Sequence, residues 1–164
     1  MTPSPLPRPA RPRLLVVDDE LDIRETLRDV IEAYLPGASV ELAASAAEAE
    51  AKLAAEPYDL LLTDYKMPGR SGLELLVVAR RVAPRMPRIM MTAFPDLGLA
   101  IRAINDGGVE MFLTKPLERA ETIRVISEAL DQTRSEEMRQ RAFERTLAIL
   151  RKRGGAVGGD GPAS

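Results

Sequence analysis

The feature that most constrains the fold is an alternation of short apolar runs with amphipathic helical patterns between residues 13 and 133. Each run is bounded by turn or capping residues, as is typical of a strand buried on both faces. Strands that alternate with helices form a parallel sheet covered on both sides. Right-handed crossovers leave few topologies, so we predict an α/β, flavodoxin-like, doubly wound five-stranded sheet in the order 2-1-3-4-5. The predicted strands are 13–17, 39–43, 59–64, 88–92 and 109–113.

Capping residues mark where several of the helices begin. Ser45 and Ser71 are each followed by a glutamate three residues later, which is the capping-box pattern. Asp96 is a candidate N-cap for the helix between the fourth and fifth strands. Each predicted helix therefore begins directly after a strand and its loop.

The chain is expected to divide into one domain with appendages. Residues 13–133 form the predicted domain, and residues 134–153 form a helical extension. Residues 1–12 hold five of the thirteen prolines and are expected to be a disordered tail. Residues 154–164 form a glycine-rich tail, also expected to be disordered.

The apolar stripe of the last helical pattern shifts along its length. Residues 119–153 therefore form either one long helix with a stutter or two helices broken near Ser135. An unbroken helix would project about 30 Å beyond the domain. It would expose Met138, Leu147 and Leu150, which favours a dimerising or partner-docking helix over a solvated extension. Acidic residues between its arginines argue against nucleic-acid binding.

Composition excludes several kinds of chemistry. The sequence has neither cysteine nor histidine, which removes thiolate metal sites and the commonest general base. A net charge of −2 gives no support for nucleic-acid binding by the whole domain. No apolar run approaches the roughly 20 residues of a membrane span. We expect a cytoplasmic protein whose chemistry uses carboxylates, hydroxyls and lysine.

Polar residues stand at the carboxyl ends of four predicted strands, where ligands bind in such sheets. Asp18 and Asp19 follow the first strand, and Asp64 ends the third. Thr92 ends the fourth strand, and Lys115 follows the fifth. Converging carboxylates repel one another, and Mg²⁺, which prefers oxygen ligands, would remove that repulsion. Lysine and hydroxyl groups would contact phosphoryl oxygens. The remaining candidate nucleophile is Asp64, because carboxylates form aspartyl phosphates.

The sequence resembles the receiver domain of bacterial two-component response regulators over residues 13–133. The matching segments are LLVVDDE, LLLTDYKMPGRSG, IMMTAF and FLTKP. The resemblance implies that Asp64 is the phosphoacceptor, that Asp19 binds magnesium directly and that Asp18 acts through water. It implies that the backbone carbonyl of Lys66 is a further magnesium ligand.

The resemblance also implies a switch. Thr92 and Lys115 match the pair that grips the phosphoryl oxygens, and Phe112 matches the aromatic residue that moves inward with Thr92 on activation. A single aromatic residue on an edge strand also serves simple packing, so both roles stay open for Phe112.

The function implied by the resemblance is phosphorelay signal transduction. A sensor histidine kinase or phosphotransfer protein would phosphorylate the chain, which would promote only its own phosphorylation and dephosphorylation. Without a recognisable DNA-binding or enzymatic output domain, it would signal through an unidentified protein partner or a weak homodimer formed by the C-terminal helix. One alternative is a Mg²⁺-dependent phosphatase or phosphotransferase using Asp64, although such phosphatases usually have an acid where this chain has Lys66. Another is an interaction module with a vestigial site.

Overall fold

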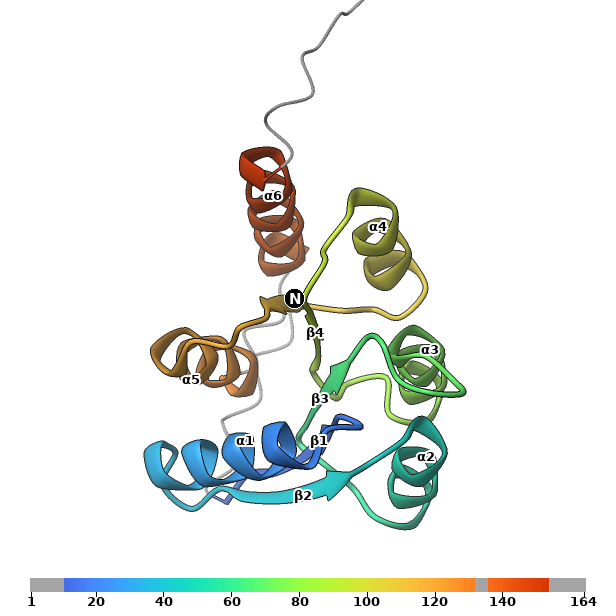
Figure 1. The fold of residues 1–164 in the computed structure, drawn as a ribbon, viewed down its shortest axis with the longest axis vertical. Helices are drawn as coiled ribbons and strands as arrows, with labels where there is room; N and C mark the ends of the chain where they lie inside the picture. Colours follow the sequence, from blue (N-terminus) through green and yellow to red (C-terminus); the bar gives the residue numbers. More distant parts are fainter. Residues whose placement is uncertain (1–10, 132–135, 154–164) are drawn as a thin grey trace, which may run out of the picture.

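The computed structural model describes residues 11–131 and 136–153. Its centre is a parallel sheet with the strand order β2-β1-β3-β4-β5 (Figure 1). This order confirms the predicted flavodoxin-like topology. The strands are β1 (Arg13–Val17), β2 (Ser39–Ala43), β3 (Leu60–Asp64), β4 (Arg88–Thr92) and β5 (Met111–Thr114).

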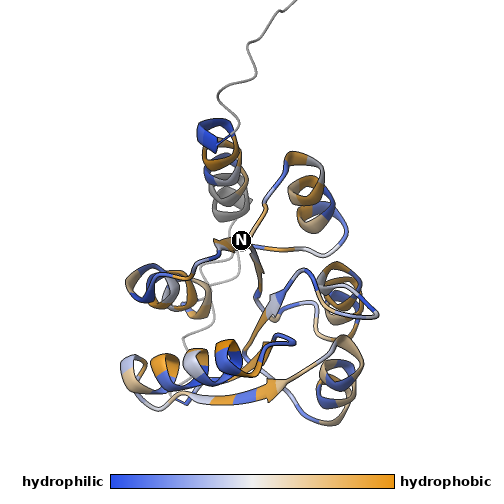
Figure 2. Ribbon diagram, viewed as in Figure 1, coloured by the Kyte–Doolittle hydropathy of each residue, from blue (hydrophilic) through white to orange (hydrophobic). Residues whose placement is uncertain are grey.

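Helices cover both faces of the sheet. One face packs on α1 and α5, and the other packs on α2, α3 and α4. Each helix carries both hydrophilic and hydrophobic residues, as expected of helices with one side on a sheet (Figure 2). The helices are α1 (Leu21–Tyr34), α2 (Ala46–Ala55), α3 (Gly72–Val82), α4 (Leu97–Asn105), α5 (Arg119–Leu130) and α6 (Glu136–Arg153).

Side chains of the central strands alternate between the two faces, as the period of a strand requires. Leu15 and Leu61 are buried on the α2–α4 side, whereas Leu14 and Leu62 are buried on the α1–α5 side. Because both faces are buried, the strands are nearly continuous apolar runs. This is the pattern from which the fold was predicted.

The three predicted helix caps are confirmed. The side chain of Ser45 accepts a hydrogen bond from the Glu48 amide at 3.1 Å, and that of Ser71 accepts one from the Glu74 amide at 3.3 Å. The carboxylate of Asp96 accepts a hydrogen bond from the Leu99 amide at 2.8 Å. These bonds satisfy amides at the start of α2, α3 and α4 that lack partners within the helix.

The predicted start of β5 at Val109 is wrong, because the strand begins at Met111. The Val109 amide donates to the Ala103 carbonyl at 3.1 Å and so still belongs to the turn that ends α4. The next amide, of Glu110, donates to the Arg88 carbonyl at 3.0 Å. Strand pairing is established only after this turn is complete.

The C-terminal segment forms two helices, α5 and α6, rather than one. The predicted break near Ser135, residues 1–10 of the predicted 1–12 tail and the predicted tail at 154–164 lie outside the described residues. The predicted end of the first tail is wrong, because Pro12 is buried and its carbonyl accepts a hydrogen bond from the Ser39 amide at 2.9 Å. Instead of projecting away from the domain, α6 packs on α4 and β5 (Figure 1). Among the described residues, no helix combines the length and the apolar character needed to cross a bilayer.

Candidate functional site

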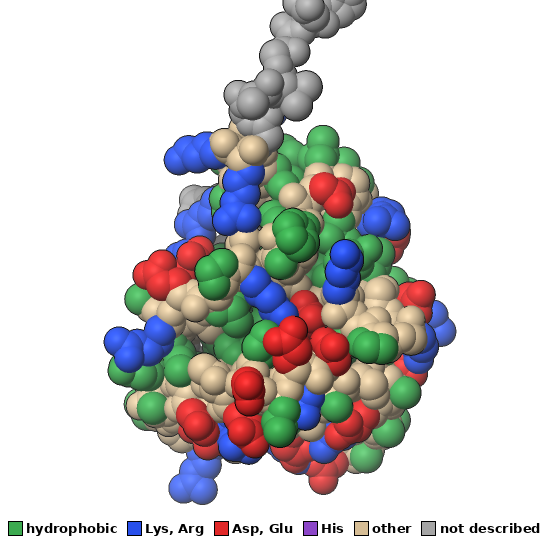
Figure 3. Space-filling view, in the orientation of Figure 1, with side chains coloured by type: hydrophobic (Ala, Val, Ile, Leu, Met, Phe, Trp, Pro, Cys, Tyr) green, Lys and Arg blue, Asp and Glu red, His purple; other side chains and the backbone are tan. Residues whose placement is uncertain are grey.

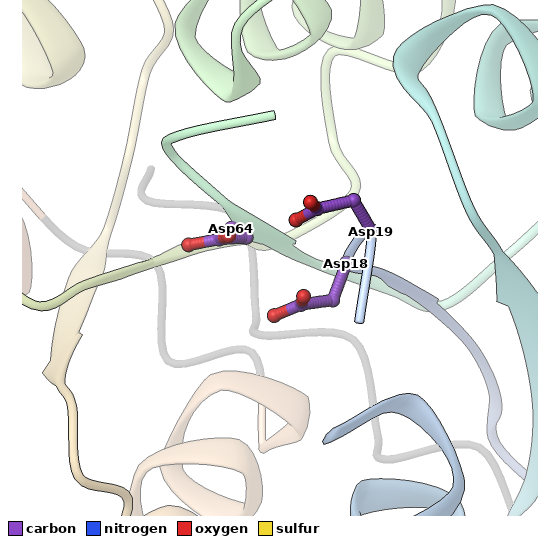
Figure 4. Close-up of side chains that lie close together, drawn as sticks. All are labelled: Asp18, Asp19 and Asp64. Carbon is purple, nitrogen blue, oxygen red and sulfur yellow. The ribbon is translucent and has the colours of Figure 1, made fainter. Parts of the chain in front are cut away.

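Three carboxylates meet at the carboxyl edge of the sheet. Asp18 and Asp19 follow β1, and Asp64 is the last residue of β3. The two strands are neighbours, with Val17 opposite Thr63, so their ends lie together. One oxygen from each of the three acids lies within 4.8 Å of the others. Their carboxylates point to the same side (Figure 4), and acidic side chains gather near the centre of the face shown in Figure 3.

Lys115 brings a positive charge to the acids from the end of β5. Its Nζ lies 2.9 Å from Asp18 Oδ2 and 3.2 Å from Asp64 Oδ1. The other oxygen of Asp18 accepts a hydrogen bond from the Glu20 amide at 2.9 Å. Asp18 is therefore fully buried and paired on both oxygens, whereas Asp64 shares Lys115 with it.

The pKa values of Asp64 and Lys115 indicate that the site holds too little positive charge to balance its three acids. Burial, followed by the neighbouring charge of Asp18, raises the pKa of Asp64 from 3.8 to about 6, and Lys115 offsets this only in part. Burial alone would lower the pKa of Lys115, but the hydrogen bond to Asp18 and the charges of both acids outweigh it and raise that pKa. The charge balance of the site therefore favours binding of a further cation.

The residues fit a magnesium ion. Ligand oxygens lie about 2.1 Å from Mg²⁺, so two oxygens on opposite sides of the ion are about 4 Å apart. A spacing within 4.8 Å therefore needs only small adjustments of the three acids. Asp19 is exposed, which leaves an open side where water and a phosphate oxygen can complete the coordination. All three donors are oxygens, the ligand type that this ion prefers.

The loop after β3, which contains Lys66, is held close to the strand end. The Gly72 amide donates to the Tyr65 carbonyl at 2.8 Å, and Arg70 pairs with Glu50 of α2. A Cβ atom on Gly72 would lie 2.0 Å from the main-chain oxygen of Asp64, a distance that no side chain can occupy. Gly72 is not among the predicted site residues, and the available signal was its position directly after the predicted helix cap Ser71.

Thr92 and Phe112 lie on the neighbouring strands β4 and β5. Thr92 is 4% exposed, and its hydroxyl accepts a hydrogen bond from the Phe94 amide at 3.3 Å. The Lys115 amide donates to the Thr92 carbonyl at 2.9 Å, which joins the two strand ends. Phe112 is half-buried and packs against the core on the α4 side of the sheet. The structure thus brings Thr92 and Lys115 to one edge and places Phe112 on the α4 side of the sheet.

A hollow of about 360 Å³ lies next to the acids, between α1 and the start of α5. Its lining is mainly apolar and includes Ile23, Leu27 and Pro116, with Lys115 at one side. The hollow is an apolar surface adjoining the charged site.

Comparison with known proteins gives consistent matches. The response regulator receiver domain family matches residues 14–127. The chain is 37% identical over 121 residues to the response regulator protein PilR of Pseudomonas aeruginosa, covering 74% of this chain and 26% of PilR. It is 36% identical over 117 residues to the DNA-binding transcriptional regulator NtrC of Escherichia coli K12, covering 70% of this chain and 24% of NtrC. The chain spans about a quarter of the length of these curated relatives.

Solved structures show the same fold. A CheY-like response regulator receiver domain protein from Methanospirillum hungatei matches with a TM-score of 0.70 and 34% identity, covering 74% of this chain and 94% of that one. The signal receiver domain of an HD domain-containing protein from Pseudomonas fluorescens matches with a TM-score of 0.69 and 32% identity, covering 73% and 94%. By its sheet order, its acidic edge and these matches, the chain belongs to the response regulator receiver domain family.

Proposed function

We propose that Asp64 accepts a phosphoryl group from the phosphohistidine of a sensor histidine kinase or phosphotransfer protein. The observation that supports this most strongly is the convergence of Asp18, Asp19 and Asp64 within 4.8 Å, with Lys115 3.2 Å from Asp64. A carboxylate oxygen of Asp64 attacks phosphorus while the bond from phosphorus to the donor imidazole breaks. The electron pair of that bond leaves with the imidazole, and the product is an aspartyl phosphate.

Magnesium binding is part of this proposal. Asp19 and Asp64 would bind the ion directly, Asp18 would act through water, and the Lys66 carbonyl would supply another oxygen. The ion supplies positive charge to the phosphoryl oxygens. Its binding would also offset the burial and the neighbouring charge of Asp18, which together raise the pKa of Asp64.

Lys115 and Thr92 hold the phosphoryl group on its other sides. Lys115 leaves its present pairing with Asp18 and Asp64 to bind one phosphoryl oxygen, and the Thr92 hydroxyl donates to another. A complete shift of a two-state equilibrium needs about 5 kcal/mol, and hydrogen bonds to charged groups contribute about 1.5–3 kcal/mol each. Two or three such contacts are therefore sufficient to drive the switch, in which Phe112 moves with Thr92.

The apolar hollow beside Lys115 suits the docking of the phosphodonor protein. A partner that places apolar side chains against Ile23, Leu27 and Pro116 would bring its phosphohistidine next to the acids. The signal then passes through altered protein contacts. The chain promotes its own phosphorylation and dephosphorylation without turning over other substrates.

Phosphorylation is tested with a small phosphodonor, Mg²⁺ and intact mass measurement. The parent is expected to gain one phosphoryl group, Asp64→Asn to gain none, and Asp19→Asn to be labelled at least about tenfold more slowly because a metal ligand is lost. Asp29→Asn, which removes an exposed carboxylate on α1, is the matched control and should label like the parent. Full labelling of Asp64→Asn would contradict the assignment, and repeated release of phosphate from a small substrate would favour the phosphatase alternative.

Lys115→Ala separates phosphorylation from switching. The variant should still be labelled, more slowly, yet the amide spectrum near Phe112 should change less than in the parent. The reason is that Lys115 couples the new charge to the strand ends. The measurement is an amide correlation spectrum with and without the phosphoryl mimic beryllofluoride, with Lys152→Ala as the control. Equal spectral changes in Lys115→Ala and the parent would show that Lys115 has no part in the switch.

A further inference from the structure

One face of the helix α6 packs against the domain. Phe143, Leu147 and Leu150 are half-buried and Thr146 is 7% exposed, whereas Ala148 on the other side is exposed. The four inward residues follow the i, i+3, i+4, i+7 spacing of a single helix face. Because α6 packs on α4 and β5, this face is the one turned toward them. We call the surface formed by α4 and β5 the α6 seat.

One polar contact reaches from α6 to α5. Arg145 Nη1 lies 3.5 Å from Glu128 Oε2 of α5. Both side chains are substantially exposed, and such surface ion pairs contribute little to stability. The last turn of α6 holds three exposed basic residues, Arg151, Lys152 and Arg153. The half-buried apolar face is therefore the main contact between α6 and its seat.

The α6 seat is connected to Thr92 by a short segment of chain, and the residue before Thr92, Met91, lies opposite Asp64 on the neighbouring strand. Thr92 ends β4, and Asp96 caps α4, with three residues between them. The Thr92 hydroxyl accepts its hydrogen bond from Phe94 within this segment, at a distance near the long end of the normal range. Phe94 itself is 78% exposed, so little packing holds the segment in place. A movement of Thr92 is thus passed directly to the beginning of α4.

β5 supplies a second connection to the same seat. Met90 of β4 pairs with Phe112, and Lys115 follows the strand directly. Phe112 packs on the α4 side of the sheet. Both elements of the α6 seat therefore contain, or directly adjoin, residues that would rearrange around a phosphoryl group on Asp64.

We propose that phosphorylation of Asp64 releases α6 from the domain. This inference rests on the proposed function of Asp64. In the structure, the Thr92 hydroxyl is engaged by Phe94, Lys115 is engaged by two carboxylates, and α6 is seated. When Thr92 and Lys115 turn to the phosphoryl oxygens, α4 and β5 move relative to each other. Packed interfaces have discrete arrangements rather than deforming continuously, so the half-buried face of α6 loses its fit.

Thermodynamic linkage makes the two effects reciprocal: binding of a phosphoryl mimic and packing of α6 change each other's free energy by the same amount. If the phosphoryl mimic weakens the seating of α6 by some factor, removal of the seating contact strengthens binding of the mimic by the same factor. Leu147→Glu places a charge on the seated face. Ala148→Glu introduces the same charge one residue later on the exposed face and is the matched control. Neither residue lies in the phosphorylation site.

The test is amide hydrogen exchange of the full chain, with Mg²⁺ and with or without beryllofluoride. A mostly polar helix of this length is marginal by itself, so protection of residues 143–153 reports seating. The mimic is expected to raise exchange of this segment at least about fivefold, the lower end of typical coupling. Leu147→Glu should exchange at the raised rate without the mimic and bind beryllofluoride at least about fivefold more tightly. Ala148→Glu should behave like the parent.

The outcomes are distinct. If beryllofluoride protects residues 60–66 but leaves exchange in 143–153 unchanged or slower, the site works and the release of α6 is wrong. If residues 143–153 exchange fast without the mimic, α6 is not seated in solution and the inference is also wrong. If neither beryllofluoride nor a phosphodonor acts on Asp64, the proposed function itself fails, and the inference fails with it.

Discussion

Gly72→Ala is expected to lower the free energy of unfolding by at least about 3 kcal/mol, a large effect for the addition of one methyl group. The added Cβ would lie 2.0 Å from the main-chain oxygen of Asp64 and 3.1 Å from the Tyr65 Cα. Neither atom belongs to a flexible side chain, so α3 must move away from the end of β3. That movement also lengthens the hydrogen bond from the Gly72 amide to Tyr65.

The variant should also bind Mg²⁺ more weakly, because the same movement displaces the loop that carries Lys66. Urea unfolding and Mg²⁺ titration measure the two effects. Gly98→Ala is the control, since its Cβ would meet only the Asp96 side chain, at 3.3 Å, and alanine is the better helix former. Its stability should change by less than about 1 kcal/mol. A Gly72→Ala protein as stable as the parent would show that α3 and β3 separate at little cost.

Asp64→Asn is expected to stabilise the metal-free protein at pH 7 by up to about 3 kcal/mol, as a shift of about two pKa units implies. Asp64 is 6% exposed, and its pKa is raised from 3.8 to about 6 by burial and by Asp18. A carboxyl whose pKa is higher in the folded state stabilises the fold at low pH. That contribution is complete below about pH 4 and is lost as the pH rises through about 6. Asparagine does not ionise, so the advantage of the variant should grow over this interval.

Urea unfolding in EDTA at a series of pH values measures this difference, with Asp29→Asn as the control. Saturating Mg²⁺ should remove most of the advantage, because binding stabilises the parent by about 2.7 kcal/mol when the free ion exceeds its dissociation constant a hundredfold. An Asp64→Asn protein that is less stable than the parent at pH 7 in EDTA would mean that Lys115 already neutralises the site. The shortage of positive charge would then be refuted.

The fold was predictable because its signals are local. Apolar runs gave the strands, and the caps at Ser45, Ser71 and Asp96 gave three helix starts. The start of β5 was not predictable, because Val109 continues the apolar run while its amide closes the turn after α4. The packing of α6 on the domain depends on contacts between segments distant in the sequence. The spacing of apolar residues within one helix does not predict such contacts.

The three acids were predictable as a group because strand order places their ends together. Their pairing was not: the approach of Lys115 to Asp18 depends on how far each side chain reaches across the sheet edge. Arg88 shows the same limit. It begins the predicted fourth strand, and nothing in the sequence indicates that it is 2% exposed and donates to the carbonyls of Ala83, Met86 and Gly107. Such contacts arise from tertiary structure alone. The roles of the site residues stay predictions.

The seating of α6 has a consequence for the solubility of the protein. β5 is the edge of the sheet, and its residues, Met111 to Thr114, carry no charge. An uncharged edge strand is a template for pairing with another chain, and proteins commonly cover such edges with a helix. The opposite edge, β2, instead carries Glu41 with its partner Arg13. Because α6 contacts this uncharged edge strand, release of α6 would leave the edge open to pairing with another chain unless another surface covered it.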